Sequence, residues 1–199
     1  MSKLDITSTA IEKSIELVKG FLEKISGAAI EEIGFMWADN IKLRRFKNQI
    51  RIFEKAQKIA KDNNLDTKKL SLRTLVPLIE YSSLEEDESL QEKWINLIVN
   101  FVDANKNYES SIFPFILSQL STIDIEVLNN FNENGSVDDN ETVCDITSFS
   151  NLIRLGLLEV QLINDDIYVS GFIQQHKRYS ITHIGSEFIK CCSRSNNDG

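Results

Sequence analysis

Four consecutive carboxylates, Glu85, Glu86, Asp87 and Glu88, are the residues of this sequence whose type best suits a hard cation such as Mg²⁺ or Ca²⁺. Side chains that follow one another on a helix point in different directions, so at most two of the four can converge on one ion. A helix is also predicted to start here, and the helix dipole favours acidic residues in the first turn. We therefore interpret the acids as a helix start and predict no metal site.

A basic segment precedes these acids and is the second candidate for a site. Between Lys42 and Lys69 the chain has ten basic residues against three acidic ones. Cations on one helix face could contact the phosphates of a nucleic acid or an acidic protein partner, and Phe46 or Phe53 could stack on bases. The candidate contacts in this segment are Arg44, Arg45, Arg51 and Lys55.

The same segment also has an interpretation that involves no ligand. Phe46, Ile50 and Phe53 recur at helical spacing, which is typical of a face buried in a core. The basic residues would then form a solvated face that pairs in part with the acids at 85–88, and such exposed pairs contribute little to stability. Both interpretations stay open at this point, and the exposure of the arginines decides between them.

The cysteines do not form a recognisable site. Cys191 and Cys192 are neighbours, Cys144 has no obvious partner, and their spacing with His183 matches no zinc pattern. Reduced thiols of a cytosolic protein are the simpler interpretation. The sequence also has no glycine-rich phosphate loop, nucleophile elbow or paired His/Glu metal motif. We predict no catalytic residue, no cofactor and no metal, and we do not expect an enzyme.

Helices must position the charged residues of the N-terminal half. Residues 8 to 62 are predicted to be helical, because apolar residues fall three or four apart in two blocks: Ile11, Ile15, Val18, Leu22 and Ile25, then Leu43, Phe46, Ile50 and Phe53. Gly20, Gly27 and Gly34 are seven apart. They indicate either a stripe for close helix approach and self-association or, more simply, a helix end at Gly20 or Gly27.

Three further helices are predicted before the chain changes character. Asn63 and Asn64 end the basic helix. The next helix begins near residues 66–70 and runs to Tyr81. Pro77 inside this second helix indicates either a kink or a later helix start. Ser83 and Glu86 fit a capping box for the following helix. That helix should bury Leu90, Trp94, Leu97, Ile98 and Phe101, and another follows Tyr108 with Phe113, Ile116, Leu117 and Leu120.

The C-terminal region has a different pattern. A short helix and a polar, acidic loop come first. A helix should then end at Gly156, and a strand should begin at Leu157. A return strand should contain Tyr179 and Ile181, and Thr182 should cap a last helix. This order is similar to a winged-helix module. We predict a mainly α fold: a helical region at 1–107, a winged-helix-like module with a small β-hairpin at 108–192, and a disordered tail at 193–199.

The winged-helix resemblance raises DNA binding as a hypothesis. The resemblance implies base contacts from the helix before Gly156 and phosphate contacts from the hairpin. Charge opposes this interpretation, because the preceding stretch from Asp124 to Asp145 has seven acids and no base. A structural or partner-docking hairpin is favoured. The residues in question are Ser148, Ser150, Asn151 and Arg154 on the helix and His176, Lys177 and Arg178 on the hairpin.

Composition sets the broad class. The net charge of −8 opposes non-specific binding of the whole surface to nucleic acid or anionic lipid, and 42% of the residues are hydrophobic, which is ordinary for a soluble protein. The N-terminus lacks the apolar core of a signal peptide, and no stretch approaches the ~20 apolar residues that span a bilayer. We expect a cytoplasmic protein and no membrane association.

One part of the sequence resembles a known family. The basic helix from Arg44 to Asn48, the block LVPLIEYSSLEEDESLQEKW and the following INLIVNF are similar to the Abi-alpha (abortive infection alpha) family, with a resemblance extending over roughly residues 27–190. The resemblance implies bacterial phage defence, and it assigns no catalytic residue. We expect a non-enzymatic component that acts by binding a protein partner or by self-association. The alternatives are a nucleic-acid-binding regulator and a membrane-acting effector that uses the N-terminal helix.

Overall fold

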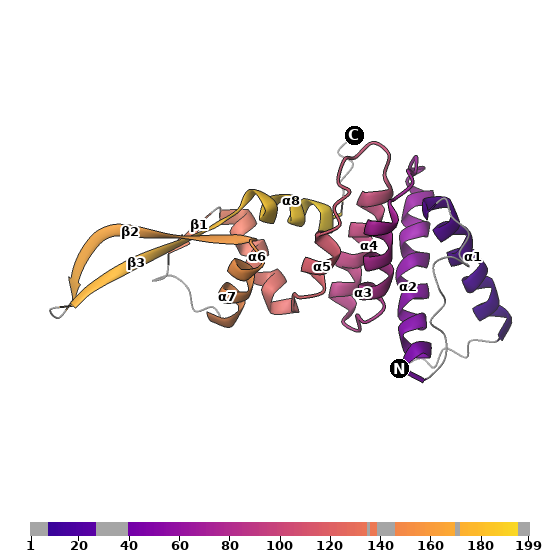
Figure 1. Cartoon of the computed structure of the whole chain (residues 1–199), viewed down its shortest axis with the longest axis horizontal. Helices are drawn as coiled ribbons and strands as arrows, with labels where there is room; N and C mark the ends of the chain where they lie inside the picture. The colour runs from indigo at the N-terminus through magenta and orange to yellow at the C-terminus, as the bar shows by residue number, and fades with distance from the viewer. Residues whose placement is uncertain (1–7, 27–39, 135, 139–145, 170–171, 195–199) are drawn as a thin grey trace. The chain divides into compact units, whose positions relative to one another are not determined.

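The computed structural model describes residues 8–26, 40–134, 136–138, 146–169 and 172–194 of the chain (Figure 1). It confirms a mostly helical fold with an antiparallel hairpin near the C-terminus. The chain divides into two compact units, Met1–Ser118 with Cys191–Gly199 and Gln119–Lys190. The elements are α1 (Ser8–Ser26), α2 (Asn40–Asp62), α3 (Leu72–Ser82), α4 (Glu88–Val102), α5 (Phe113–Leu117), α6 (Thr122–Asn134), β1 (Ser136–Asp138), α7 (Ile146–Arg154), β2 (Leu158–Val169), β3 (Phe172–Ile181) and α8 (His183–Cys192).

The core of the first unit forms where α2 packs against both α1 and α4. On α4 the predicted face is confirmed, since Leu90, Trp94, Leu97, Ile98 and Phe101 are all buried. On α2 the buried face is rotated from the predicted one. The buried face of α2 must contact both α1 and α4. It therefore consists of Ile52, Phe53, Ala56 and Ala60, whereas Phe46 and Ile50 are half-buried.

The helix ends in this unit follow from local hydrogen bonds. The end of α2 before the two asparagines is confirmed, and Asn64 takes a positive φ of 50°. The predicted start of α3 within 66–70 is too early. These residues are extended because Lys68 N–H donates to the Val102 carbonyl and Ala104 N–H donates to the Asp66 carbonyl. The later start agrees with one of the two interpretations of Pro77, which lies inside α3.

The glycine stripe lies mostly outside the described residues, as Gly27 and Gly34 fall between α1 and α2. Gly20 is inside α1 and does not end it. A Cβ atom built on Gly20 would meet no described atom within 4 Å, so none of the described helices and strands approaches it closely. Self-association through these glycines stays a prediction.

The second unit holds a three-stranded antiparallel sheet in the order β1-β3-β2 within the described residues. Phe149 joins the helices to this sheet, with its ring 5.6 Å from that of Phe131 and 4.8 Å from that of Tyr179. The predicted helix end is confirmed by a φ of +71° at Gly156, a conformation that favours glycine. The cap of α8 is also confirmed, since Thr182 Oγ1 accepts a hydrogen bond from Gly185 N–H at 2.9 Å.

Strand β1 was expected to be part of a polar loop. It forms because its backbone pairs with β3, placing Ser136 opposite Ser180 and Asp138 opposite Arg178. This pairing joins positions 40 to 44 residues apart along the chain, so the local acidic sequence does not reveal it.

The division between the units falls after Ser118, later than the predicted boundary at 107/108. The difference arises because α5 packs on helices of the first unit: the Phe115 ring lies 6.4 Å from that of Tyr81, and the Phe113 ring lies 6.4 Å from that of Phe101. Of the predicted tail, Ser193 and Arg194 are placed in the first unit, and 195–199 lie outside the described residues. None of the described helices has both the length and the apolar composition to cross a membrane.

Candidate functional site

The outer face of α2 carries a row of basic residues. Lys47, Arg51, Lys55 and Lys58 are exposed, and their spacing of four, four and three residues places them on one side of the helix. Lys61 continues this face and is also exposed. The buried residues of α2 lie on the opposite side of the helix. Of the predicted contacts, Arg51 and Lys55 are therefore exposed on one surface. The regular spacing in the sequence would have identified Lys47 and Lys58 as well.

Arg44 and Arg45 do not join this surface. The side chain of Arg44 lies outside the described residues. Arg45 is half-buried, and its Nε atom is buried without a hydrogen-bond partner. The suggested base stacking by Phe53 is wrong, because this side chain is 1% exposed and packs in the core. The outer face of α2 thus offers cations, without the exposed ring that stacking on a base requires.

The acidic residues before α4 have structural roles of their own. The predicted capping box at Ser83 and Glu86 is wrong: Ser83 ends α3, and its Oγ donates to the Glu80 carbonyl. Asp87 is the N-cap of α4, and its carboxylate accepts from Ser89 N–H and Leu90 N–H. Glu85 accepts from the backbone amides of Glu86 and Asp87. The chain turns sharply between α3 and α4, so these amides need side-chain acceptors.

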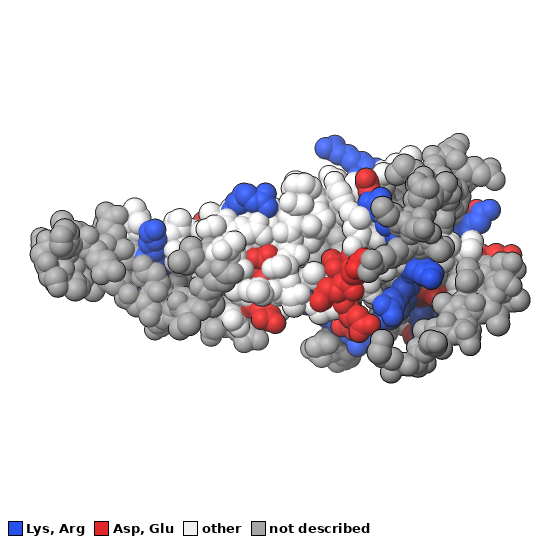
Figure 2. Space-filling view, turned by 90° about the horizontal axis from the view of Figure 1, so that it is seen from below, with Lys and Arg blue, Asp and Glu red and all other residues white. Residues whose placement is uncertain are grey.

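Glu88 connects the acidic segment to the basic helix. Its Oε1 atom lies 3.6 Å from Arg51 Nη1, which also donates to Gln91 Oε1 at 3.4 Å. The side chains of Arg51 and Glu88 are 49% and 84% exposed, so this ion pair contributes little to stability. Figure 2 shows acidic and basic side chains side by side on one face of the first unit. The solvated-face interpretation is correct for this pair, whereas Lys47, Lys55 and Lys58 form no ion pair with a described residue.

The cap of α4 gives a prediction about pH. Hydrogen bonds from Ser89 and Leu90 hold the pKa of Asp87 below its ordinary value of 3.8. A carboxylate with a lowered pKa in the folded state stabilises the fold above its unfolded pKa and loses that contribution as the pH falls through the folded pKa. Asp87→Ala should therefore lower the melting temperature at neutral pH, and the difference from the natural chain should shrink in acid. Thermal melts of both proteins followed by circular dichroism measure this; a difference that does not change with pH would contradict it.

Helix α7 of the second unit was the candidate for reading DNA bases. Ser148 is wrong as a contact, because it is 5% exposed and faces the interior. Asn151 donates to the Gln119 carbonyl at 3.0 Å and to Asp124 Oδ2 at 3.2 Å. Its own Oδ1 accepts from Arg154 Nη2 at 2.7 Å. The amide and guanidinium groups that would bind bases are thus already bound to each other and to the start of α6.

The acceptor of Asn151 belongs to a capping box that the sequence analysis did not identify. Asp124 Oδ2 accepts from Ser121 N–H at 2.8 Å, and Ser121 Oγ accepts from Asp124 N–H at 3.2 Å. Asp124 is 4% exposed, and the neighbouring hydroxyl and amide groups compensate its buried carboxylate. The spacing Ser-x-x-Asp before an apolar pair was the signal that could have identified it.

The basic residues of the hairpin lie on two different faces. Lys177 is opposite Leu162, and Arg178 is opposite Gln161, so their side chains leave β3 on opposite sides. Both are exposed, and the side chain of His176 lies outside the described residues. Two cations on opposite faces of one strand do not form a single phosphate-binding surface.

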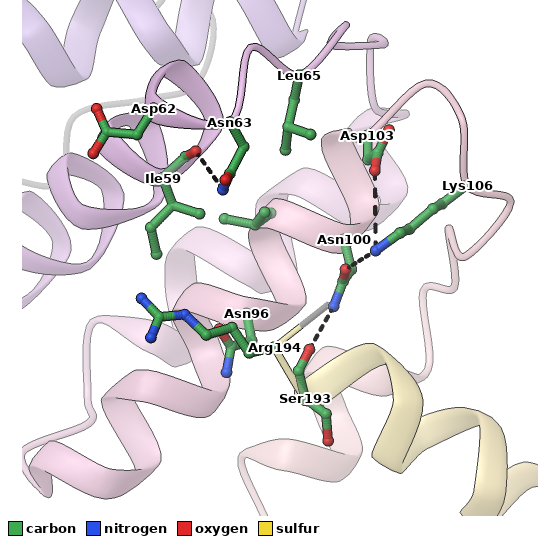
Figure 3. A pocket seen from close by; sticks show the side chains of 11 residues that line it. Ile59, Asp62, Asn63, Leu65, Asn96, Asn100, Asp103, Lys106, Ser193 and Arg194 are labelled. Atoms are coloured by element: carbon green, nitrogen blue, oxygen red, sulfur yellow. Dashed lines mark hydrogen bonds and ion pairs between the residues drawn. The ribbon is translucent and has the colours of Figure 1, made fainter. Parts of the chain in front are cut away.

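A pocket of about 270 Å³ lies in the first unit where α2 and α4 end (Figure 3). Two of its polar side chains are already engaged: Asn100 Nδ2 donates to the Cys191 and Ser193 carbonyls at 2.8 and 3.0 Å, and Lys106 Nζ donates to Asn100 Oδ1 at 2.7 Å. Asn96 donates to the Cys192 carbonyl in the same way. These side chains compensate the free carbonyls of helix ends and hold the C-terminal segment in place.

The two thiols beside this pocket are not reactive groups. Cys191 and Cys192 are buried and form no disulfide with a described residue. Burial, and then the neighbouring Cys191 thiol, raise the pKa of Cys192 well above its usual range, which keeps it protonated. Cys144 lies outside the described residues, and His183 is exposed. Among the residues that the structure describes, no three His, Cys, Asp or Glu side chains are grouped to hold a metal ion.

The described residues form a mostly helical protein of two units, with a charged surface on α2 and an unpaired outer edge on strand β2. They contain no group of three His, Cys, Asp or Glu side chains that could hold a metal ion. The model of the abortive infection alpha family matches residues 38–140, and the chain belongs to that family. The match covers α2 to α6 and β1 and ends before α7, so it is shorter than the resemblance over 27–190. No curated protein and no solved structure matches the chain. Membership of the family associates the chain with abortive infection, a bacterial defence against phage.

Proposed function

We propose that this protein is a non-enzymatic component of bacterial phage defence that acts by binding a protein partner through its second unit. The family supports the context. A binding role is supported by Asn100 and Lys106 of the pocket, which are engaged in hydrogen bonds at the end of a helix and are not arranged around a substrate.

The observation that carries this proposal is the outer edge of β2. This strand pairs with β3 on one side, and within the described residues no strand pairs with its other side. Val160 and Leu162 leave the same face of the strand and are 44% and 56% exposed. An edge strand with apolar side chains adds a strand from another chain readily, because backbone hydrogen bonds supply affinity and the side chains supply specificity.

The element order of this unit supports a winged-helix-like arrangement used for protein contact. A helix, a short strand, a helix and a hairpin follow one another, and β1 pairs with β3 at the base of the hairpin. The second unit has eleven acidic and four basic residues. This negative charge disfavours DNA binding and favours a protein partner whose added strand is neutral or basic. Glu159, on the opposite face from Val160, is exposed and suits a basic side chain on that strand.

Leu162→Lys and Gln161→Lys test this function as a matched pair. Both add one positive charge at neighbouring exposed positions of β2, but on opposite faces. We expect Leu162→Lys to abolish phage protection, measured as efficiency of plating on bacteria that express the protein. Gln161→Lys should protect like the natural chain.

A direct contact is then checked by placing a photo-crosslinking amino acid at position 162 or at position 161. We expect a specific crosslinked protein from position 162 in infected cells and none from position 161. Protection by Leu162→Lys equal to that of the natural chain, with both proteins folded by circular dichroism, would show that the edge of β2 is not the functional surface. A crosslink to a second copy of the chain would show that the edge of β2 mediates self-association and does not bind a different protein.

A further inference from the structure

The outer face of α2 carries a second interaction surface, separate from the edge of β2. The row Lys47, Arg51, Lys55 and Lys58 has its two ends eleven residues apart on the helix, which at the helical rise is about 16 Å. Every one of them is exposed. The helix cannot turn this face inward, because its opposite face is fixed in the core by Ile52, Phe53 and Ala56, which are 0–1% exposed. The cations are therefore held in a row on a rigid element.

Among the described residues, one acidic side chain pairs with this row. Arg51 has Glu88 at 3.6 Å, whereas no ion pair joins Lys47, Lys55 or Lys58 to a described residue. Glu54, the acid within the row, is half-buried, and Asp62 lies at the far end of the helix. The overall charge of −8 does not describe this surface, because eleven of the thirty acids are in the second unit with only four of the twenty-two bases. The first unit has nineteen acids and eighteen bases, so the row is a local excess of basic residues on a nearly neutral unit.

The chemistry of the row fits a phosphate backbone and not bases. No aromatic ring is exposed on it, since Phe53 is buried and Phe46 is half-buried, so bases cannot stack there. The lysines are flexible point charges without the planar fork that reads guanine. We propose that the outer face of α2 binds the sugar–phosphate backbone of a nucleic acid without reading its sequence.

Glu88 acts as a competitor within this site. Its carboxylate is 84% exposed and occupies Arg51, the one cation of the row with a guanidinium group. A phosphate that approaches Arg51 Nη1 competes with this carboxylate and is repelled by its charge, and an exposed pair of this kind costs little to separate. Removing the carboxylate should therefore strengthen nucleic-acid binding. A variant that gains affinity cannot be explained by misfolding.

The test measures binding of fluorescein-labelled single-stranded RNA and duplex DNA by anisotropy across a series of salt concentrations. For three to four phosphate contacts we expect log K to fall with log salt at a slope of about −2 to −4. The triple variant Lys47→Glu, Lys55→Glu and Lys58→Glu should lose at least about tenfold in affinity at low salt, with a slope near zero. Glu88→Gln should bind about two to five times more tightly than the natural chain.

The matched control makes the same charge change on α1, where Lys13, Lys19 and Lys24 are also exposed. The triple variant Lys13→Glu, Lys19→Glu and Lys24→Glu should retain most of the affinity. Equal losses in the two triple variants would show that net charge alone matters and would overturn the proposal. So would an absence of nucleic-acid binding by the natural chain at low salt, or no gain in affinity with Glu88→Gln.

Binding to phosphatidylserine vesicles but to neither nucleic acid would assign the outer face of α2 to a membrane instead. Leu162→Lys should bind like the natural chain, which separates this site from the edge of β2.

Discussion

Replacing Asn100 by alanine is expected to lower the free energy of unfolding of the first unit by about 3 kcal/mol, as is typical when a buried hydrogen-bond network is broken. Asn100 is 2% exposed and uses its whole amide group. The two N–H groups donate to the Cys191 and Ser193 carbonyls, and the oxygen accepts from Lys106. Alanine would leave two carbonyls of a helix end without these donors and Lys106 without its acceptor.

Asn96→Ala is the control for this prediction. Asn96 is on the same helix and donates to the Cys192 carbonyl, but it makes one bond of 3.3 Å and is half-buried. Its loss should cost about 1 kcal/mol or less. Urea unfolding of the three proteins, followed by tryptophan fluorescence, compares the midpoints. Equal midpoints for Asn96→Ala and Asn100→Ala would mean that the buried network does not hold the C-terminal segment.

Gly185→Ala is expected to destabilise the second unit by about 3 kcal/mol, in the range of overpacked cores. A Cβ atom on Gly185 would lie 2.3 Å from the Leu157 carbonyl oxygen and 2.9 Å from Ile181 Cγ1. The carbonyl cannot move away freely, because it also accepts from Thr182 N–H at 3.0 Å. The first turn of α8 would therefore have to shift away from the start of β2.

Gly20→Ala is the matched substitution in an open position. Gly20 is within α1, and a Cβ atom there meets nothing within 4 Å. Alanine should stabilise the helix by up to about 1 kcal/mol, since glycine is the poorer helix former. Chemical denaturation followed by circular dichroism gives both values. A stabilising or neutral Gly185→Ala would show that α8 does not pack against the Leu157 carbonyl as closely as the structure has it.

Periodic and local signals predicted a large part of this fold. The buried face of α4, the helix end at Gly156 and the cap at Thr182 depend on residues close together in the sequence, and all three are confirmed. Features that depend on distant partners were not predictable in this way. Strand β1 exists because of β3, and the buried face of α2 is set jointly by α1 and α4.

Capping shows the same difference at smaller scale. Ser83 and Ser121 both precede an acid by three residues, and the sequence favoured the first. The structure uses Ser121 with Asp124, because Asn151 of α7 supports that carboxylate, and it places Asp87 at the start of α4. For the candidate site, composition predicted a basic α2, whereas tertiary packing determined that Arg51 and Lys55 are exposed and that Phe53 is not.

The first unit is not continuous in the chain, since it stops at Ser118 and resumes at Cys191. On the ribosome the chain emerges from its N-terminus, so α1 to α5 leave first while the acceptors of Asn100 are 91 and 93 residues behind it. Contacts of such long sequence separation form slowly, because the intervening chain must be closed into a loop. The segment that completes the first unit is thus synthesised after the whole of the second. We expect a nascent chain arrested before Cys191 to carry a first unit more open to protease than the full chain.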